Sequence, residues 1–340
     1  MLESQTNSQV LGLRKSELRF FHLVQLCSML ITLRLHNVDF TDSADGESFR
    51  KYIRELDLRP PVLIKPNWGC SRVFTEAQVI DWALSAIDGE KLVVESYGWA
   101  RTKEFLETGK MGSKGRSDLR KSDTWFLKYS GIDKVLEKHN VEFLNITEEN
   151  WGKRTANPED IRQVVEKGFE PVQFDRMYSE VPQRLYELRG GTLLSLAKLR
   201  LGLPPYAVSL SVKNLFGMIP GPGRYSPYHG KQNCNLSQSV LDINKVYRSL
   251  FTVKGMIEGV LTTDVIEDMM GSATTHRDLH LLWASKDPIQ LDALVAVQFD
   301  RDPSKIDYLR HSAETLGMWS NGVISDGEKN SLIGLIAAHK

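Results

Sequence analysis

Residues 60–99 read PPVLIKPNWGCSRVFTEAQVIDWALSAIDGEKLVVESYGW, and this stretch decides the fold. The segment PPVLIKPNW is an apolar run that ends at a turn, which is typical of a buried strand. TEAQVIDWALSAI has helical spacing with Thr75 as the expected N-cap, and KLVVESYGW is a second apolar strand. Strand, helix and strand in succession predict an α/β fold with a mostly parallel sheet covered by helices.

The same alternation extends along most of the chain on both sides of this stretch. In the helix that begins KDPIQLD, Asp287 is the expected N-cap and Pro288 the first helical residue. Residues 108–122, rich in Gly, Ser and Lys, predict a mobile loop. The remaining expected elements are strands at 31–40, 141–146, 191–201, 206–212 and 279–285, and helices at 47–56, 131–139 and 237–251.

The expected organisation is two α/β lobes with a cleft between them. Residues 31–190 would form the first lobe, with a polar excursion near 148–189, and residues 191–340 the second. Residues 1–30 are expected as an N-terminal helical extension. Its apolar part is interrupted by polar residues and is too short for a membrane span, so we expect a buried helix that runs into a strand.

The composition excludes several classes of function. Lys+Arg and Asp+Glu both number 43 in 340 residues, so no overall basic field would recruit nucleic acid or a membrane surface. Cys27, Cys70 and Cys234 are widely spaced, which fits a reducing cytoplasm and forms no zinc or iron–sulfur motif. The chain also has neither a dinucleotide-binding glycine turn nor a phosphate-binding P-loop motif.

Polar side chains follow four of the predicted strands. In open parallel sheets, ligands bind beyond the carboxyl ends of the strands, so these residues are the expected substrate contacts. They are Lys65 and Asn67, Glu95 and Arg101, Lys198 and Arg200, and Lys213 and Asn214.

Residues 211–230, SVKNLFGMIPGPGRYSPYHG, hold an unusual amount of turn chemistry after the fourth of these strands. The glycines allow backbone N–H groups to approach an anion, and Arg224 can bind a carboxylate or phosphate through two hydrogen bonds. Neutral His229 is a base near physiological pH. This pattern predicts a pocket for an anionic substrate, and the alternative is a loop whose prolines and glycines only turn the chain.

Other candidate residues keep two interpretations. Lys65 is either a clamp for a substrate carboxylate or a salt-bridge partner. Glu95 is either a general base, with a pKa raised by burial, or the partner of Lys65. Tyr225 and Tyr228 either stack on a ligand or pack at the rim.

No cofactor is expected, and a divalent metal is the alternative. If a metal is bound, His229 and Glu258 are the expected ligands, together with the acidic residues that follow Glu258. The two histidines of THRDLH, residues 275–280, are further candidates. A solvated acidic turn is the competing interpretation of this segment.

Several motifs, in order, resemble the domain of unknown function 362 family. These are IKPNW, TEAQVIDWALSAI and VVESYGWART in the first half, followed by LLSLAKLRL, SLSVKNLFGMIPG, VKGMIEG and LLWASKDPIQLDALVA. The resemblance implies a fold related to that of nickel-dependent lactate racemases, and an association with ferredoxin-type domains. The chain departs from the family pattern at Arg200, where the Lys-Thr-His of the family becomes Arg-Leu-Gly, and after Gly259, where a glycine-rich run is replaced.

We therefore expect a cytoplasmic enzyme that acts on a small amino, hydroxy or keto acid, in specialised metabolism. The reaction would be cofactor-independent proton transfer next to a carbonyl, giving isomerisation, epimerisation, cyclisation or elimination, as an isomerase or lyase. His229 and Glu95 would act as acid and base, with Lys213 stabilising developing negative charge. The alternatives are a metal-dependent enzyme, or a non-catalytic partner of a ferredoxin-type protein; a homodimer is compatible with each.

Overall fold

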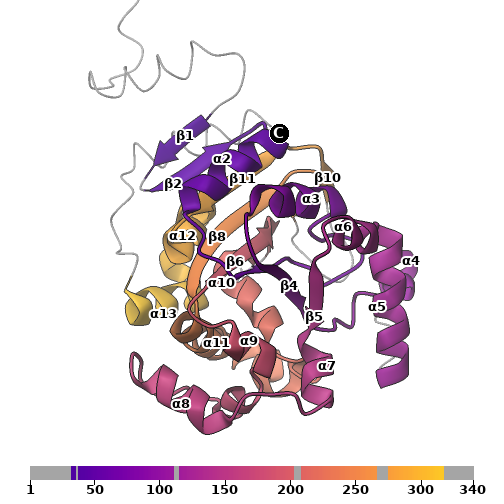
Figure 1. The fold of residues 1–340 in the computed structure, drawn as a ribbon. Helices are drawn as coiled ribbons and strands as arrows, with labels where there is room; N and C mark the ends of the chain where they lie inside the picture. The colour runs from indigo at the N-terminus through magenta and orange to yellow at the C-terminus, as the bar shows by residue number, and fades with distance from the viewer. Residues whose placement is uncertain (1–31, 36, 111–114, 203–207, 266–274, 318–340) are drawn as a thin grey trace, which may run out of the picture.

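The computed structural model describes residues 32–35, 37–110, 115–202, 208–265 and 275–317 (Figure 1). Its centre is an eight-stranded sheet with the strand order β1-β2-β11-β8-β6-β3-β4-β5. The strands are β1 (Thr32–Leu35), β2 (Val38–Thr41), β3 (Val62–Lys65), β4 (Lys91–Glu95), β5 (Glu142–Asn145), β6 (Thr192–Lys198), β8 (Thr252–Gly259) and β11 (Leu281–Ser285). A second, three-stranded sheet joins β7 (Arg200–Leu201), β9 (Thr262–Val265) and β10 (Thr275–Arg277).

The predicted α/β class with a mostly parallel sheet is confirmed. Strands β8, β6, β3, β4 and β5 are parallel neighbours, and β11, β2 and β1 extend one edge in the antiparallel sense. The division into two lobes is not confirmed, because β3 to β5 from the first half and β6, β8 and β11 from the second share this one sheet.

Helices cover both faces of the sheet, as Figure 1 shows. Neighbouring residues of a strand point to opposite faces, so Leu193 of β6 belongs to one hydrophobic core and Leu194 to the other. The helices are α2 (Gly46–Leu56), α3 (Ala77–Ala86), α4 (Lys103–Thr108), α5 (Arg116–Ser130), α6 (Ile132–Lys138), α7 (Ile146–Trp151), α8 (Pro158–Glu166), α9 (Gln183–Glu187), α10 (Ser211–Asn214), α11 (Leu236–Leu250), α12 (Pro288–Gln298) and α13 (Asp307–Leu316). The core that contains Leu193 packs under α11, α12 and α13. The core that contains Leu194 packs under α2, α3 and α6.

Helix starts follow local side-chain chemistry in some places and tertiary contacts in others. Asp287 caps α12 by accepting a hydrogen bond from Ile289 N, with Pro288 at the first helical position, as predicted. The prediction of Thr75 as the cap of α3 is wrong, because Glu76 occupies that position. The Thr75 hydroxyl instead accepts a hydrogen bond from Asn67 N and donates one to Leu196 O.

Three other expected elements differ from the structure. The strand predicted at 31–40 is the β1–β2 hairpin, whose turn includes Asn37 in a left-handed conformation. The loop predicted at 108–122 becomes α5 from residue 116 onward. No strand forms over the described part of 206–212; Val208 makes one isolated bridge to Leu201, and the chain then enters α10.

The polar excursion near 148–189 is largely helical and lies against α11. Asp242 of α11 accepts hydrogen bonds from Gln173 N at 2.8 Å and Phe174 N at 3.0 Å, and Lys245 donates one to Glu170 O. These contacts hold residues 170–174 against α11. Residues 1–30, which include the predicted N-terminal helical extension, lie outside the described residues.

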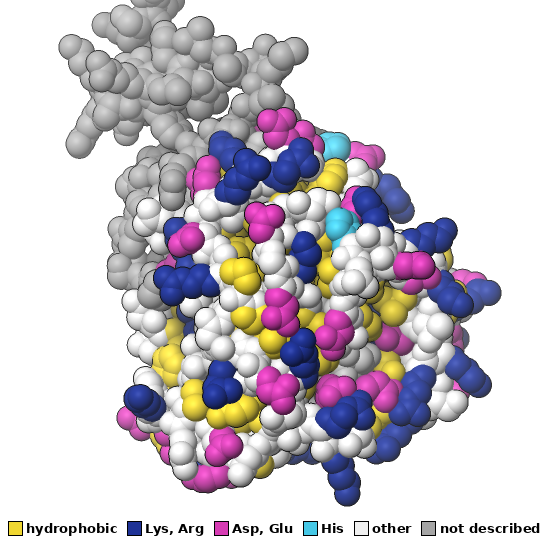
Figure 2. Space-filling view, in the orientation of Figure 1, with side chains coloured by type: hydrophobic (Ala, Val, Ile, Leu, Met, Phe, Trp, Pro, Cys, Tyr) yellow, Lys and Arg dark blue, Asp and Glu magenta, His cyan; other side chains and the backbone are white. Residues whose placement is uncertain are grey.

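The visible surface carries charges of both signs (Figure 2). Lys and Arg side chains alternate with Asp and Glu over this face, in agreement with a formal net charge of zero. Within the described part of the chain, each helix falls short of the length or the apolar character that a bilayer crossing requires.

Candidate functional site

A buried ion pair lies where two neighbouring parallel strands end. Lys65 is the last residue of β3 and Glu95 is the last residue of β4, so the two side chains meet at the same edge of the sheet. Lys65 Nζ is 2.8 Å from Glu95 Oε2, and the two residues are only 1% and 3% exposed. The predicted pairing of Glu95 with Lys65 is therefore confirmed.

Every carboxylate oxygen of Glu95 is engaged. Oε2 also accepts a hydrogen bond from Trp68 N at 3.2 Å, and Oε1 accepts one from Ser96 N at 2.8 Å. Lys65 donates to Pro66 O at 2.7 Å. Burial lowers the pKa of Lys65, and the charge of Glu95 acts in the opposite direction. Both side chains are therefore buried and held by hydrogen bonds within the protein.

Helix α10 joins this pair from the second half of the chain. Asn214 donates from Nδ2 to Lys65 O at 2.8 Å and to Ser195 Oγ at 3.1 Å. The helix start is held by Asp292, whose carboxylate accepts hydrogen bonds from Ser211 N and Val212 N, both at 2.8 Å. A four-residue helix is not stable alone, so these long-range contacts fix its position.

At two positions in residues 211–230 the backbone passes so close to other groups that only glycine fits. A Cβ at Gly217 would lie 2.6 Å from Lys65 Nζ and 2.8 Å from Glu95 Oε1, and a Cβ at Gly221 would overlap Tyr97 O. A Cβ at Gly223 would meet nothing within 4 Å. The loop is therefore pressed against the ends of β3 and β4.

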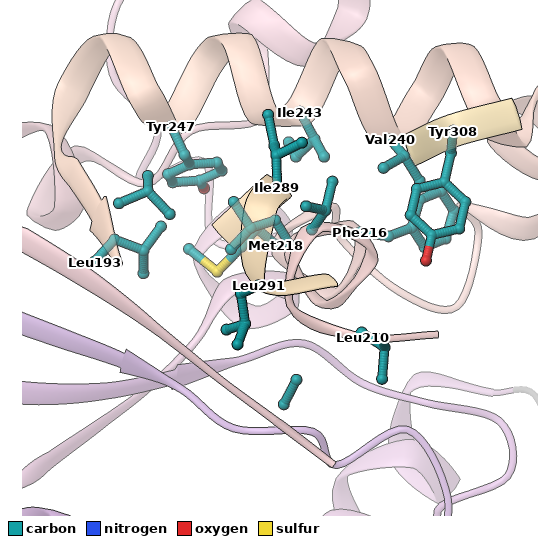
Figure 3. Packing of buried hydrophobic residues seen from close by; sticks show 14 of the residues in the cluster. Leu193, Leu210, Phe216, Met218, Val240, Ile243, Tyr247, Ile289, Leu291 and Tyr308 are labelled. Carbon is teal, nitrogen blue, oxygen red and sulfur yellow. The ribbon is translucent and has the colours of Figure 1, made fainter. Parts of the chain in front are cut away.

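Apolar side chains of the same loop anchor it in the hydrophobic core. Phe216 and Met218 are buried in the core that includes Ile289 and Leu291 of α12, as Figure 3 shows. The stretch is therefore held by a polar cluster on one side and by the hydrophobic core on the other.

Arg224 places a positive charge in this buried loop. One guanidinium nitrogen, Nη1, donates to Ser96 Oγ and to Ile219 O, the latter at 2.9 Å. The residue is 6% exposed, its Nε is buried without a hydrogen-bond partner, and no described carboxylate lies within 4 Å of the guanidinium. A buried charge without a counterion is unfavourable, so this geometry favours an anionic ligand.

The charge of Arg224 acts on the pKa of Lys213. Its Nζ donates to Ser209 Oγ at 3.2 Å, and Ser209 N in turn donates to Arg200 O at 2.9 Å. Burial, together with the charges of Arg200 and Arg224, lowers the pKa of Lys213 to about 8. A substantial fraction of this amine is therefore neutral near physiological pH.

His229 lies among aromatic rings at the end of the loop. Its ring centroid is 4.9 Å from that of Phe216 and 5.0 Å from that of Tyr225, and Tyr225 stacks on Trp99. Nδ1 lies 2.8 Å from Asn233 Oδ1, an oxygen that can only accept, so Nδ1 carries the proton and Nε2 keeps a lone pair. Burial lowers the pKa of His229 to about 4, which keeps the ring neutral.

Other predicted site residues are engaged in structural contacts. Lys198 pairs with Glu76 at 2.6 Å and Glu258 at 2.8 Å, and Arg101 pairs with Asp123. The positive charges of Lys198 and Arg101, which were expected to bind substrate, are therefore compensated by carboxylates within the protein.

Two further residues that were predicted to contact substrate make hydrogen bonds within the protein. The Tyr228 hydroxyl donates to Glu180 Oε2 at 2.9 Å, which favours the packing interpretation of this ring. Asn67 is buried, and its side-chain oxygen faces Gly69 N at 3.5 Å.

The two residues predicted as metal ligands have different neighbours among the described residues. His229 contacts Phe216, Tyr225 and Asn233, whereas Glu258 contacts Lys198 and Val260 N, so the two belong to separate clusters. Within the described ranges, no three His, Cys, Asp or Glu side chains are grouped as metal ligands. Part of the acidic segment after Glu258, residues 266–274, lies outside the described residues, as does the side chain of His276.

Sequence reasoning missed two serines of the cluster. Ser195 supports Asn214, and Ser209 binds Lys213. A signal existed for Ser195, because it is the one hydroxyl residue inside the apolar run LLSLA. No local signal marks Ser209, which reaches Lys213 only because the chain turns into α10 instead of continuing as a strand.

Comparison with known protein families gives one result. The model of the family described as Domain of unknown function (DUF362) matches residues 62–297, which is more than half of the chain. Comparisons with curated proteins and with solved structures give no match. The chain belongs to the DUF362 family.

Proposed function

We propose that this member of the DUF362 family is an enzyme that binds a small anionic acid at Arg224 and transfers a proton next to its carbonyl group. The observation that carries the proposal is the buried guanidinium of Arg224, with an unpartnered Nε and no described carboxylate within 4 Å. A carboxylate or phosphate is the ligand that a guanidinium binds best.

The charges around Arg224 support an anion. Two nearby cations are neutralised, since Lys65 pairs with Glu95 and Arg101 pairs with Asp123. Arg224 in turn lowers the pKa values of Lys65, Lys213 and His229, so these groups lie within its electrostatic field. A bound anion would offset this repulsion.

Lys213 and His229 are the proposed proton-transfer groups. An amine with a pKa of about 8 exchanges protons readily near neutral pH, and the neutral ring of His229 offers Nε2 as an acceptor. We assign Glu95 a different role from the general base expected earlier, because its oxygens are already engaged by Lys65, Trp68 and Ser96. It orients Lys65 and the end of β3.

The proposed reaction class is isomerisation, epimerisation, cyclisation or elimination without a redox cofactor. We place it in the cytoplasm, where three widely spaced cysteines remain reduced. Metal analysis of the purified protein tests the cofactor-independent mechanism; stoichiometric nickel, iron or zinc would favour the metal-dependent or iron–sulfur alternative.

Ligand-dependent melting tests the anion site. Lactate, malonate, glycine and phosphate would be added separately to the wild-type protein and to Arg224→Gln, whose amide retains a hydrogen-bond donor without the charge. We expect at least one anion to raise the melting temperature of the wild type and not that of the variant. Arg310→Gln, on the exposed side of α13, is the control and should respond like the wild type. An equal response in Arg224→Gln, or none in the wild type, would refute the proposal.

A further inference from the structure

Lys213 has the surroundings of a nucleophilic amine. Two guanidinium groups, those of Arg200 and Arg224, favour its neutral form, and the Ser209 hydroxyl holds Nζ at 3.2 Å. Lysines are activated as nucleophiles in this way, by desolvation and by an adjacent cationic group. The residue as a whole is half-buried.

The backbone of Lys213 is fixed before any ligand arrives. Asp292 holds the first two N–H groups of α10, and Asn214 ties the end of the helix to β3 and β6. A nucleophile on a rigid support loses little entropy when it reacts.

The partner groups define what this amine would attack. Arg224 has an unpartnered Nε that can bind a carboxylate, its charge lowers the pKa of Lys213, and the ring of Tyr225 lies beside both Arg224 and His229. A substrate held there by its carboxylate would present the neighbouring carbon to the amine. We infer that Lys213 forms an imine with a small keto or aldehyde acid whose carboxylate is held by Arg224. This inference rests on the proposed function and narrows its substrate to carbonyl acids.

The step is balanced without any additional reactant. The Nζ lone pair forms a C–N bond to the carbonyl carbon while the C–O π electrons move to oxygen, which takes a proton. Nζ then loses a proton, and the hydroxyl takes a proton and leaves as water as the C=N bond forms. His229 Nε2 is the proposed carrier of these protons, since its lone pair is available and Lys213 lies within its electrostatic field.

The imine would serve the proposed proton transfer. A protonated imine withdraws electrons from the adjacent carbon and so makes its C–H bond more acidic, which gives an enamine after proton removal. The enamine carbon then takes a proton back, which restores the protonated imine. Addition of water reverses the first step and releases the carbonyl product, the free amine and a proton.

Reductive trapping tests the inference on the full chain. The protein would be incubated with pyruvate or glyoxylate and sodium cyanoborohydride, and the product analysed by intact mass and peptide mapping. We expect one equivalent of adduct, located on Lys213, and a trapping rate that rises with a midpoint near the pKa of about 8. Lys213→Arg should lose the adduct, and Arg224→Gln should require more probe. Lys305→Arg, at an exposed lysine, should be labelled like the wild type.

The outcomes separate this inference from the proposed function. No adduct, an adduct spread over surface lysines, or unchanged labelling of Lys213→Arg would overturn the imine. Lactate has a carboxylate like that of pyruvate and glyoxylate, but a hydroxyl group in place of their keto or aldehyde group. If lactate still stabilises the wild type in an Arg224-dependent manner while trapping fails, the result supports the anion site and refutes the imine. If neither acid has any effect, both proposals fail.

Discussion

At the scale of single residues, the site is organised around the Lys65–Glu95 pair. Both residues end buried strands, and their charges compensate each other in a region with almost no solvent. Removal of one partner from such a pair leaves a buried charge, which costs more than the pair itself contributes. The sequence predicted that both residues lie at strand ends, and it left open whether they react or pair. That choice depends on N–H groups of Trp68 and Ser96, which no local pattern reveals.

The first prediction concerns this pair. Glu95→Gln should lower the free energy of unfolding by about 3–5 kcal/mol, because buried Lys65 would lose the counterion that compensates its charge. Urea denaturation measures the change. Glu107→Gln removes one partner of the exposed Lys103–Glu107 pair and should cost at most about 0.5 kcal/mol. Equal effects for the two variants would contradict the importance of burial.

The second prediction concerns the glycines of residues 211–230. Gly217→Ala should destabilise the protein by about 1–3 kcal/mol, since the new methyl group would collide with the ion pair. Gly223→Ala is a matched control in the same loop and should change stability by less than about 0.5 kcal/mol. Thermal or urea unfolding of both variants checks this, and a stable Gly217→Ala protein would show that the loop does not press on the pair.

At the scale of elements, local patterns predicted those that local chemistry stabilises. Helix α12 begins at Pro288 with Asp287 as its cap, as Asp-Pro indicates. Helix α10 could not be predicted in this way, because its start is held by Asp292, which lies some eighty residues further along the chain. The apolar alternation before it resembles a strand, and tertiary contacts override that preference.

Strands β6 and β8 provide the third prediction, because Lys198 and Glu258 lie directly opposite each other. Burial raises the pKa of Glu258 to about 8, against the opposing charge of Lys198. A carboxyl group with a raised pKa binds its proton more tightly in the folded state, so its contribution is complete below the ordinary pKa of 4.5 and is lost as pH rises towards 8. The wild type should therefore lose stability relative to Glu258→Gln between about pH 5 and about pH 8.

Urea unfolding at a series of pH values measures this difference. Glu187→Gln, at an exposed position of α9, is the control and should leave the pH profile of the wild type unchanged. A stability difference between wild type and Glu258→Gln that stays constant with pH would show that Glu258 does not titrate in this range.

At the scale of the whole molecule, the sheet brings distant segments together. Strands β3 and β4 come from the first half and β6 and β8 from the second, and they are adjacent in the order β8-β6-β3-β4. The fold class followed from alternating strands and helices, but strand order did not, because periodicity carries no information on neighbours. The expected division into two lobes is not confirmed, and residues 211–230 lie over the carboxyl ends of β3 and β6 in this one sheet.

The fourth prediction tests the central claim that this edge of the sheet catalyses proton transfer on a small acid. Exchange of the hydrogen next to the carboxylate would be followed by proton NMR in D₂O, with pyruvate, lactate and alanine as probes. The wild type should accelerate exchange for at least one of them, and Lys213→Arg should reduce that rate by a factor of about 10²–10⁴. An exchange rate equal to that of buffer for all three acids, or one that is unchanged in both Lys213→Arg and Arg224→Gln, would contradict the account.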